Sequence, residues 1–180
     1  MRLNLLLAAL VLPLAMPASA ALAPGAKAPD FTTRGAINGQ VFRLHLKERL
    51  KKGPVVLYFF PKAFTGGCNA EAKAFADAVP DFAKAGATVI GMSADTVPDL
   101  QRFSTQHCAG KFGVASAGPN VIRSYDVMLK KPDGAETGIS DRTSFVIAPN
   151  GTILLAHSDM NPAEHVAKTL AAVRAWKAKH

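Results

Sequence analysis

The stretch "PVVLYFFPKAFTGGCNAEAKAF", residues 54–75, predicts a buried strand that passes through a short loop into a helix. Residues 54–60 are continuously apolar and rich in valine and aromatic side chains, which is typical of a central strand buried on both faces. Pro61 ends this strand, two glycines follow, and alanine-rich helical composition begins at Cys68, with Pro80 expected to interrupt the helix. One of only two cysteines in the chain therefore lies where a strand turns into a helix.

The segments on either side continue the alternation of strands and helices. An Asn-Gly dipeptide at residues 38–39 is a tight-turn signal, so a hairpin is expected near the N-terminus. Residues 88–93 predict the next buried strand. Residues 95–110 predict a helix that Asp95 or Thr96 caps.

The C-terminal part adds an edge strand near residues 127–129, a hairpin around residues 150–151 and a final amphipathic helix over residues 161–179. That helix is expected to place Val166, Leu170, Val173 and Trp176 on one apolar stripe. Strands that alternate with helices in this order predict an α/β protein. We expect a thioredoxin-like fold, with a central mixed β-sheet flanked by helices and an N-terminal β-hairpin.

The first twenty residues have the pattern of a signal peptide. Arg2 supplies the positive start, an apolar stretch follows, and Ala18 and Ala20 form a small-residue cleavage site. We therefore expect residues 1–20 to be removed, and residues 21–180 to form one domain in the periplasm or in secreted form, with no membrane attachment after cleavage. An uncleaved anchor is the alternative.

Charge and histidine spacing exclude two function classes. The formal net charge is +8, but the densest basic run, residues 47–52, contains an acid and has no interleaved aromatics, so it is expected to be a solvated face. No nucleic-acid partner is therefore expected. The five histidines show no metal-ligand spacing, and no haem or nucleotide motif is present, so no cofactor and no metal are expected.

Two cysteines in an exported protein would ordinarily form a structural disulfide, but the surroundings of Cys68 favour reactivity. A helix start offers unpaired backbone N–H groups and the positive end of the helix dipole, which both stabilise a thiolate. Gly66 and Gly67 would let backbone amides approach a small substrate, and Thr65 could aim its hydroxyl at the sulfur. One helix end supplies only about 0.3–2 kcal/mol, so a fixed cation is also expected nearby.

Three segments resemble the peroxiredoxin family. "PKAFTGGC" at residues 61–68 has the P-x-x-x-T-x-x-C pattern of that family, and "CNAE" at residues 68–71 carries its frequent glutamate. "DRTSFVIAPNGTI" at residues 141–153 resembles the segment that holds the family's active-site arginine. The resemblance runs from residue 26 to residue 176 and is strongest to the bacterioferritin comigratory protein, or peroxiredoxin Q, subfamily.

The resemblance implies a role for each matching residue. Cys68 would be the peroxidatic thiolate, which reduces hydrogen peroxide or an organic hydroperoxide and becomes a sulfenic acid. Thr65 and Arg142 would hold the thiolate and polarise the O–O bond. Pro61 would limit access of water, and Glu71 would orient Arg142.

The second cysteine matches one group of the same subfamily. Many relatives resolve the sulfenic acid with a cysteine five residues further on, but Lys73 occupies that position here. "FSTQHCAGKFG" resembles the segment in which other members carry the resolving cysteine, so Cys108 is implied to form an intramolecular disulfide with Cys68. A thioredoxin-like or glutaredoxin-like dithiol protein would reduce it, and the resemblance implies a monomer.

The main alternative is an exported thioredoxin-fold protein in which Cys68 and Cys108 form a structural disulfide and the chain has a non-catalytic binding role. A dithiol oxidoreductase would need Cys-x-x-Cys, and copper delivery would need two close cysteines. "CNAE" supplies neither.

Overall fold

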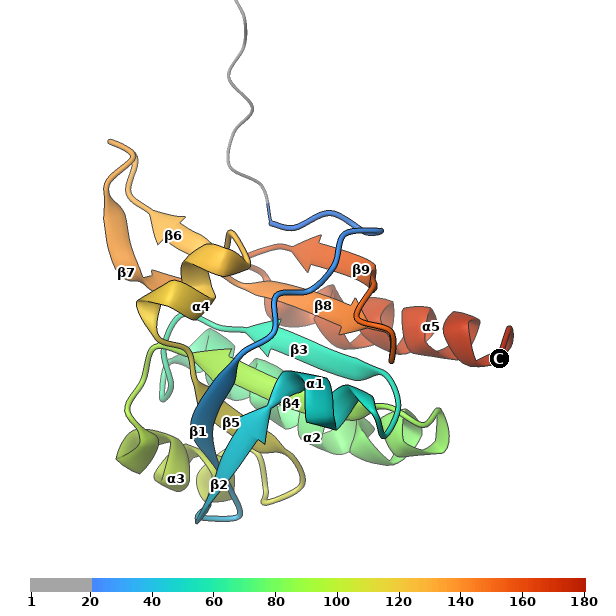
Figure 1. Cartoon of the computed structure of the whole chain (residues 1–180). Helices are drawn as coiled ribbons and strands as arrows, with labels where there is room; N and C mark the ends of the chain where they lie inside the picture. The colour runs from blue at the N-terminus through green and yellow to red at the C-terminus, as the bar shows by residue number, and fades with distance from the viewer. Residues whose placement is uncertain (1–20) are drawn as a thin grey trace, which may run out of the picture.

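The computed structural model describes residues 21–180, which form a seven-stranded sheet with helices on both faces (Figure 1). The expected signal peptide, residues 1–20, lies outside the described residues. From one edge of the sheet to the other, the strand order is β2 (Gln40–His45), β1 (Thr32–Ile37), β5 (Gly113–Ser116), β4 (Thr88–Ser93), β3 (Val55–Phe59), β8 (Thr143–Ile147) and β9 (Ile153–Ser158).

The centre of the sheet is mixed, as the sequence predicted. Strand β3 runs parallel to β4 and antiparallel to β8, and all five of its residues are buried. Its alternate side chains enter different apolar clusters, Val56 and Tyr58 on one face, Leu57 and Phe59 on the other. Burial on both faces explains why this segment is a continuous apolar run.

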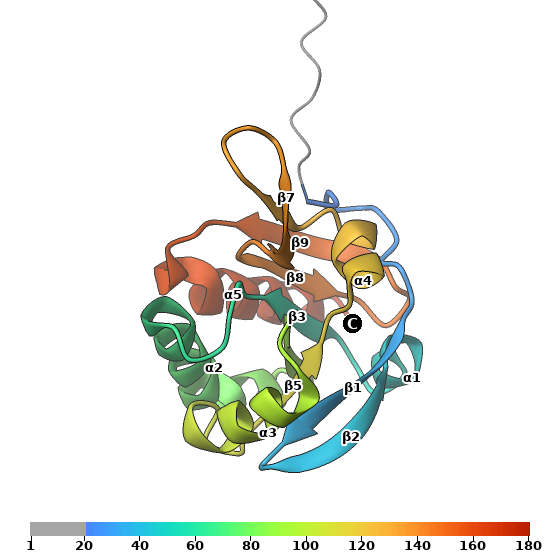
Figure 2. The same ribbon diagram turned by 90° about the vertical axis from the view of Figure 1, so that its left-hand side faces the viewer.

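Helices cover the two faces of the sheet unequally. Figure 2 shows two groups of helices on opposite sides of the sheet. The larger group is α2 (Gly66–Lys84), α3 (Val97–Gln106) and α5 (His165–Lys177), with the short 3₁₀-helix η1 (Pro162–Glu164) before α5, and the smaller group is α1 (Leu46–Leu50) and α4 (Pro119–Ser124). The larger group shields the cluster that contains both cysteines.

Several predicted elements are confirmed. The N-terminal hairpin β1–β2 turns at Asn38 and Gly39, which both have positive φ, at 48° and 74°. Strand β4 has the predicted bounds, the β8–β9 hairpin surrounds Asn150 and Gly151, and Thr96 caps α3 by accepting from the Asp99 N–H.

The prediction that Pro80 interrupts the helix after Cys68 was wrong. Helix α2 continues through Pro80 to Lys84. Proline removes one helical N–H and disfavours the conformation. However, Ala76 and Phe82, on either side of it, are 2% and 1% exposed, so tertiary packing holds both halves of the helix against the sheet.

Other elements differ from the expectation in place or in existence. Helix α3 ends at Gln106, so Cys108 lies in the turn beyond it. The predicted edge strand is β6 (Met128–Lys130), which pairs with β7 (Glu136–Ser140) in a separate two-stranded sheet rather than with the central one. Strand β5 and helix α1 are too short to leave a periodic signal, and the sequence did not predict them.

The buried stripe of α5 is also shifted from the expectation. His165, Thr169 and Val173 are fully buried, whereas Trp176 is partly exposed. The offset brings a histidine into the interior, beside the candidate active site described below.

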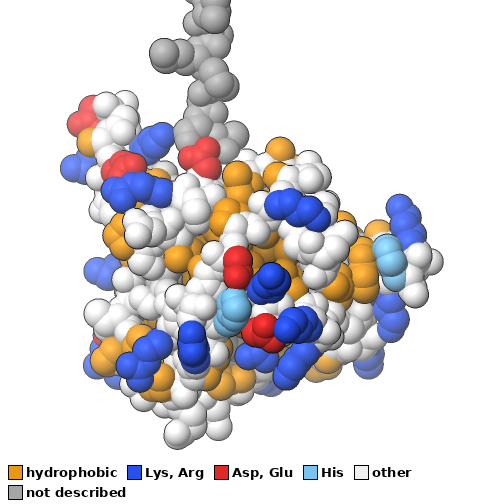
Figure 3. Space-filling model, in the orientation of Figure 1, with side chains coloured by type: hydrophobic (Ala, Val, Ile, Leu, Met, Phe, Trp, Pro, Cys, Tyr) orange, Lys and Arg blue, Asp and Glu red, His pale blue; other side chains and the backbone are white. Residues whose placement is uncertain are grey.

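The surface over α1 is polar. Figure 3 shows side chains of both charge signs and histidine gathered there, and Lys51 pairs with Glu48 at 2.8 Å. Lys47, Glu48, Lys51 and Lys52 are exposed, as expected for a solvated face, whereas Arg49 is half-buried and Leu50 is buried. Among residues 21–180, no helix combines the length and the apolar character that a membrane crossing requires.

Candidate active site

Cys68 lies in the first turn of α2 and is 2% exposed. Thr65 is the N-cap residue, and its carbonyl accepts the Asn69 N–H at 2.8 Å. The Thr65 side chain makes no capping hydrogen bond, so it takes up none of the first-turn N–H groups. These donors and the helix dipole attract negative charge at the Cys68 position.

Arg142 is the fixed cation expected near Cys68. It directly precedes β8, which pairs with β3, and this pairing brings it from far along the chain to the start of α2. Its Nη2 donates to Cys68 Sγ at 3.4 Å, and its side chain is 5% exposed. A guanidinium at this position is a permanent positive charge beside the sulfur.

Two further contacts fix the orientation of the Arg142 fork. Its Nη1 pairs with Glu71 Oε2, and its Nε donates to the Met160 carbonyl at 3.0 Å. Burial lowers the pKa of Arg142, but Glu71 and Cys68 outweigh this effect, so the pKa is raised overall. The guanidinium therefore stays charged.

Glu71 lies one turn after Cys68 on α2 and is fully buried. Burial raises its pKa to about 7, and Arg142 opposes that rise. Its Oε2 faces Arg142, while its Oε1 has no hydrogen-bond partner among residues 21–180 and lies 3.7 Å from His165 Nδ1. The carboxyl thus sits between a permanent cation and an imidazole.

Sequence reasoning missed His165. Its Nε2 lies 2.8 Å from the Asp159 carbonyl, which can only accept, so Nε2 carries the proton and Nδ1 accepts from the Ser144 hydroxyl at 2.8 Å. Burial lowers the pKa of His165 to about 4, which keeps it neutral. Its place in a helical stripe with Thr169 and Val173 was the only signal in the sequence.

Gly67 allows the close approach of Arg142 to the sulfur. A Cβ at Gly67 would lie 3.2 Å from Arg142 Nη2, tighter than ordinary van der Waals contact, whereas one at Gly66 would meet nothing within 4 Å. The sequence suggested glycines here for the approach of a substrate. The structure adds that the neighbour of Gly67 is the arginine itself.

The loop before Cys68 is tied to the next strand. The Ala63 N–H donates to Asp95 Oδ2 at 2.7 Å, and Ser93 Oγ donates to the same oxygen at 2.8 Å. Asp95 was expected only as a helix cap, so this role was missed. Pro61 is half-buried in the loop, and the Thr65 hydroxyl is exposed and donates to the Lys62 carbonyl at 2.9 Å.

Cys108 is a free thiol, as is Cys68, and both belong to the apolar cluster on the α2 face of the sheet. It is fully buried in the turn after α3. Burial raises its pKa well above the ordinary value for cysteine. Its sulfur is therefore a protonated, shielded thiol in this conformation.

The described residues include no group of three or more His, Cys, Asp or Glu side chains that could hold a metal ion. The chemistry that the geometry offers is that of one sulfur, one guanidinium and a helix N-terminus. A cysteine placed this way has the surroundings that activate a sulfur nucleophile, which is the reactive group of thiol-dependent peroxidases.

Comparison with known proteins agrees with this class. The profile of the AhpC/TSA family matches residues 24–156, which is well over half of the chain, so the protein belongs to that family. Peroxiredoxin Bcp of Bacillus subtilis is 31% identical over 147 residues, 81% of this chain and 91% of that protein. Peroxiredoxin Bcp of Xanthomonas campestris is 32% identical over 123 residues, 67% of this chain and 76% of that protein. For the rice chloroplastic peroxiredoxin Q, at 31% identity, the match spans 81% of this chain and 64% of that protein.

Solved structures show the same relationship. Peroxidoxin BcpB of Mycobacterium tuberculosis superposes with a TM-score of 0.75 at 30% identity, covering 84% of this chain and 96% of that one. A structure of Xanthomonas campestris bacterioferritin comigratory protein, described for its alkyl peroxide reduction activity, has a TM-score of 0.70 at 29% identity. The match covers 80% of this chain and 91% of that one. The expected fold and the resemblance to the bacterioferritin comigratory protein and peroxiredoxin Q subfamily are therefore confirmed.

Proposed function

We propose that Cys68 is the peroxidatic cysteine and that it reduces hydrogen peroxide and organic hydroperoxides. The observation that carries this proposal is the Arg142 guanidinium, 3.4 Å from a sulfur in the first turn of a helix. The alkyl peroxide reduction named for the Xanthomonas campestris structure supports organic hydroperoxides as substrates.

In the first step the Cys68 thiolate attacks the terminal oxygen of the hydroperoxide. An S–O bond forms and the O–O bond breaks, so the sulfur is oxidised to a sulfenic acid and the peroxide is reduced. The leaving alkoxide or hydroxide takes a proton from solvent. Arg142 stabilises the charge on the leaving oxygen, since its fork donates in a fixed direction.

Thr65 and Pro61 complete the proposed substrate site. The Thr65 hydroxyl is exposed and donates to the Lys62 carbonyl, and a side-chain rotation turns it toward an incoming peroxide oxygen. Pro61 has no N–H group and is half-buried, so it limits hydration on its side of the sulfur.

Cys108 resolves the sulfenic acid. Its sulfur attacks that of Cys68, an S–S bond forms, and the hydroxyl leaves as water. Because burial raises the pKa of Cys108, this step requires its turn to open. Phe64, in the loop before α2, and Ala109, next to Cys108, have positive φ of 63° and 49°. Opening of these segments would release a left-handed conformation that is unfavourable for residues other than glycine.

A thioredoxin-like or glutaredoxin-like dithiol protein then reduces the disulfide to two thiols. Both cysteines belong to one chain, so the cycle needs no second copy, and the protein acts as a monomer. The signal-like pattern of residues 1–20 supports export to the periplasm or secretion.

A peroxide-consumption assay with native protein, Cys68→Ser and Cys108→Ser tests the proposal. Cys68→Ser is expected to be inactive, and Cys108→Ser to consume one equivalent of peroxide and then to recycle poorly through a dithiol protein. Intact-mass analysis of native protein after one equivalent of peroxide should show an intramolecular disulfide. An active Cys68→Ser variant would refute the peroxidatic role, and a disulfide-linked dimer or a stable sulfinic acid would refute the role of Cys108.

A further inference from the structure

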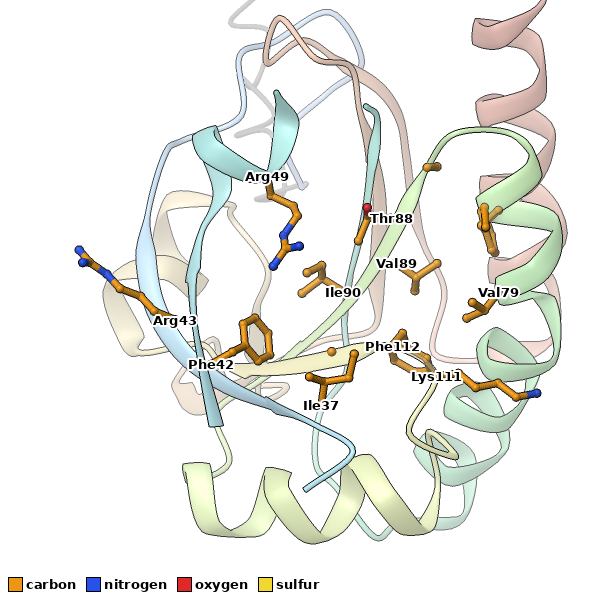
Figure 4. A pocket seen from close by; sticks show the side chains of 14 residues that line it. Ile37, Phe42, Arg43, Arg49, Val79, Thr88, Val89, Ile90, Lys111 and Phe112 are labelled. Atoms are coloured by element: carbon orange, nitrogen blue, oxygen red, sulfur yellow. The ribbon is translucent and has the colours of Figure 1, made fainter. Parts of the chain in front are cut away.

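An apolar cleft lies at the far end of α2 from the candidate active site. It has a volume of about 390 Å³, within the range of small-molecule sites. It opens where β4 and β5 begin, between the β1–β2 hairpin, α1 and the C-terminal half of α2 (Figure 4). From Cys68 to Val79, the first α2 residue in its wall, the helix rises roughly 16 Å. The cleft is therefore separate from the peroxidase site.

The walls of the cleft are aliphatic and aromatic. Its floor is built on Gly113, since a Cβ there would lie 2.8 Å from the Phe42 ring, which packs directly over the glycine backbone. Ile37 is 38% exposed although it is apolar. The other large apolar side chains that line the cleft are Val79, Phe82, Val89, Ile90 and Phe112. A ligand that covers the exposed part of this apolar surface would remove it from water, which favours binding.

One cation points into this apolar space. Figure 4 shows the Arg49 guanidinium directed from α1 toward Ile90 and Phe42, whereas Arg43 and Lys111 point outward. Arg49 is half-buried and has no ion pair or side-chain hydrogen bond among residues 21–180, and no Asp or Glu lines the cleft.

The acidic residue next to Arg49 in the sequence already has a partner. Glu48, the neighbour of Arg49 on α1, pairs with Lys51 at 2.8 Å. The cleft thus combines an apolar wall with an unneutralised guanidinium, which matches one negative headgroup on an apolar body.

We propose that this cleft binds a free alkyl carboxylate of medium chain length, with the carboxylate on Arg49 and the chain against Phe42, Val79 and Phe112. A small amphipathic anion fits better than a polypeptide because the surface is concave and presents one inward cation. Binding is non-covalent and leaves Cys68 untouched.

Titration of the ¹⁵N-labelled protein with decanoate, followed by ¹H–¹⁵N NMR, tests the proposal. We expect saturable shifts at the amides of Val89 and Phe112, with a Kd below about 1 mM, and none at Cys68. Decyltrimethylammonium, with the same chain and the opposite charge, should bind at least tenfold more weakly. Arg49→Gln should weaken decanoate binding at least tenfold, while Arg34→Gln, which removes an exposed charge outside the cleft, should leave it within twofold.

A second pair of variants tests the location independently of charge. Ala83→Phe fills the cleft from α2 and should abolish the shifts, whereas Ala74→Phe, exposed on the same helix away from the cleft, should not. The spectrum of each variant also reports whether it is folded. Shifts confined to the Cys68 region, equal binding of the cationic probe, or an unaffected Arg49→Gln would overturn the proposal. So would binding only to anionic vesicles, or cleft shifts that grow with protein concentration without decanoate.

Discussion

At the level of single residues, the sulfur of Cys68 faces the permanent charge of Arg142, whose orientation is fixed by three contacts. The Arg142 guanidinium donates to the sulfur, to Glu71 and to the Met160 carbonyl through different nitrogens. A lysine keeps the charge, but its three N–H donors share one nitrogen on a flexible stem, so it lacks the rigid fork that reaches these three partners through separate nitrogens. Geometry, rather than charge alone, is therefore expected to matter for catalysis.

Arg142→Lys is expected to lower the second-order rate constant with hydrogen peroxide by about 100- to 1000-fold, since it removes an oriented donor to the transition state. Stopped-flow measurement of the reduced protein checks this. Arg123→Lys, which changes a surface arginine paired with Glu136, serves as the control and should leave the rate within twofold. If the two variants react equally fast, Arg142 has no orienting role.

Burial shifts the pKa values of Glu71 and His165 in opposite directions, because it disfavours the charged form of each group. The pKa of Glu71 is raised from 4.5 to about 7, so its contribution to stability is present below about pH 4.5 and is lost as pH rises to 7. The pKa of His165 is lowered from 6.5 to about 4, so its contribution is present above about pH 6.5 and is lost as pH falls to 4. Between pH 4.5 and 6.5 the two contributions oppose each other.

Replacing one partner should expose the effect of the other. Relative to the native protein, the unfolding free energy of Glu71→Gln should rise from pH 4.5 to 6.5, and that of His165→Asn should fall, each by about 2 kcal/mol. Urea unfolding of the reduced proteins at both pH values measures this. Profiles parallel to the native one would show that the two groups do not titrate as described.

At the scale of elements, the start of α2 contains two glycines with different neighbours. Gly66 faces open space, while Gly67 faces Arg142 Nη2. Both lie in a helix, where glycine is less favourable than alanine by up to about 1 kcal/mol. The cost at Gly67 is offset by the access that it gives to the arginine.

Gly67→Ala is therefore expected to displace the guanidinium by a few tenths of an ångström and to slow the reaction with peroxide about tenfold. Gly66→Ala is the matched control, and it should retain the native rate and gain up to about 1 kcal/mol of stability. Stopped-flow kinetics and urea unfolding separate the two effects. Equal rates for both variants would contradict the role given to Gly67.

At the scale of the whole molecule, the sheet separates two apolar clusters that each bury a tyrosine. The Tyr58 hydroxyl has no hydrogen-bond partner among residues 21–180, and its ring stacks on Phe75 at 4.3 Å. The Tyr125 hydroxyl donates to the Pro29 carbonyl at 2.8 Å on the other face. A buried hydroxyl without a hydrogen-bond partner lowers the stability of the fold, whereas a hydrogen-bonded one raises it.

Tyr58→Phe should accordingly leave the unfolding free energy unchanged or raise it, and Tyr125→Phe should lower it by about 1 kcal/mol. Urea unfolding at neutral pH gives both values. A Tyr58→Phe variant destabilised as much as Tyr125→Phe would mean that the Tyr58 hydroxyl is satisfied in solution.

Long periodic segments could be predicted from the sequence because their pattern is local. The continuous apolar run of β3, the Asn-Gly turn of the first hairpin and the helical composition after Cys68 each carry their own signal. Pro80 was misjudged because burial of its neighbours outweighs a local preference. Strand β5 and helix α1 are short, and they depend on tertiary contacts with the rest of the sheet rather than on a local sequence signal.

Local sequence patterns were enough to predict that a cysteine would follow a buried strand at the start of a helix, and the motifs indicated the family. Which side chains surround that cysteine and its loop depends on the packed fold, because Arg142, His165 and Asp95 reach them through strand pairing and helix packing. Those contacts join residues 71, 94 and 32 positions apart. No local periodicity encodes such separations, and burial, which sets the pKa of Glu71, exists only once the layers have packed.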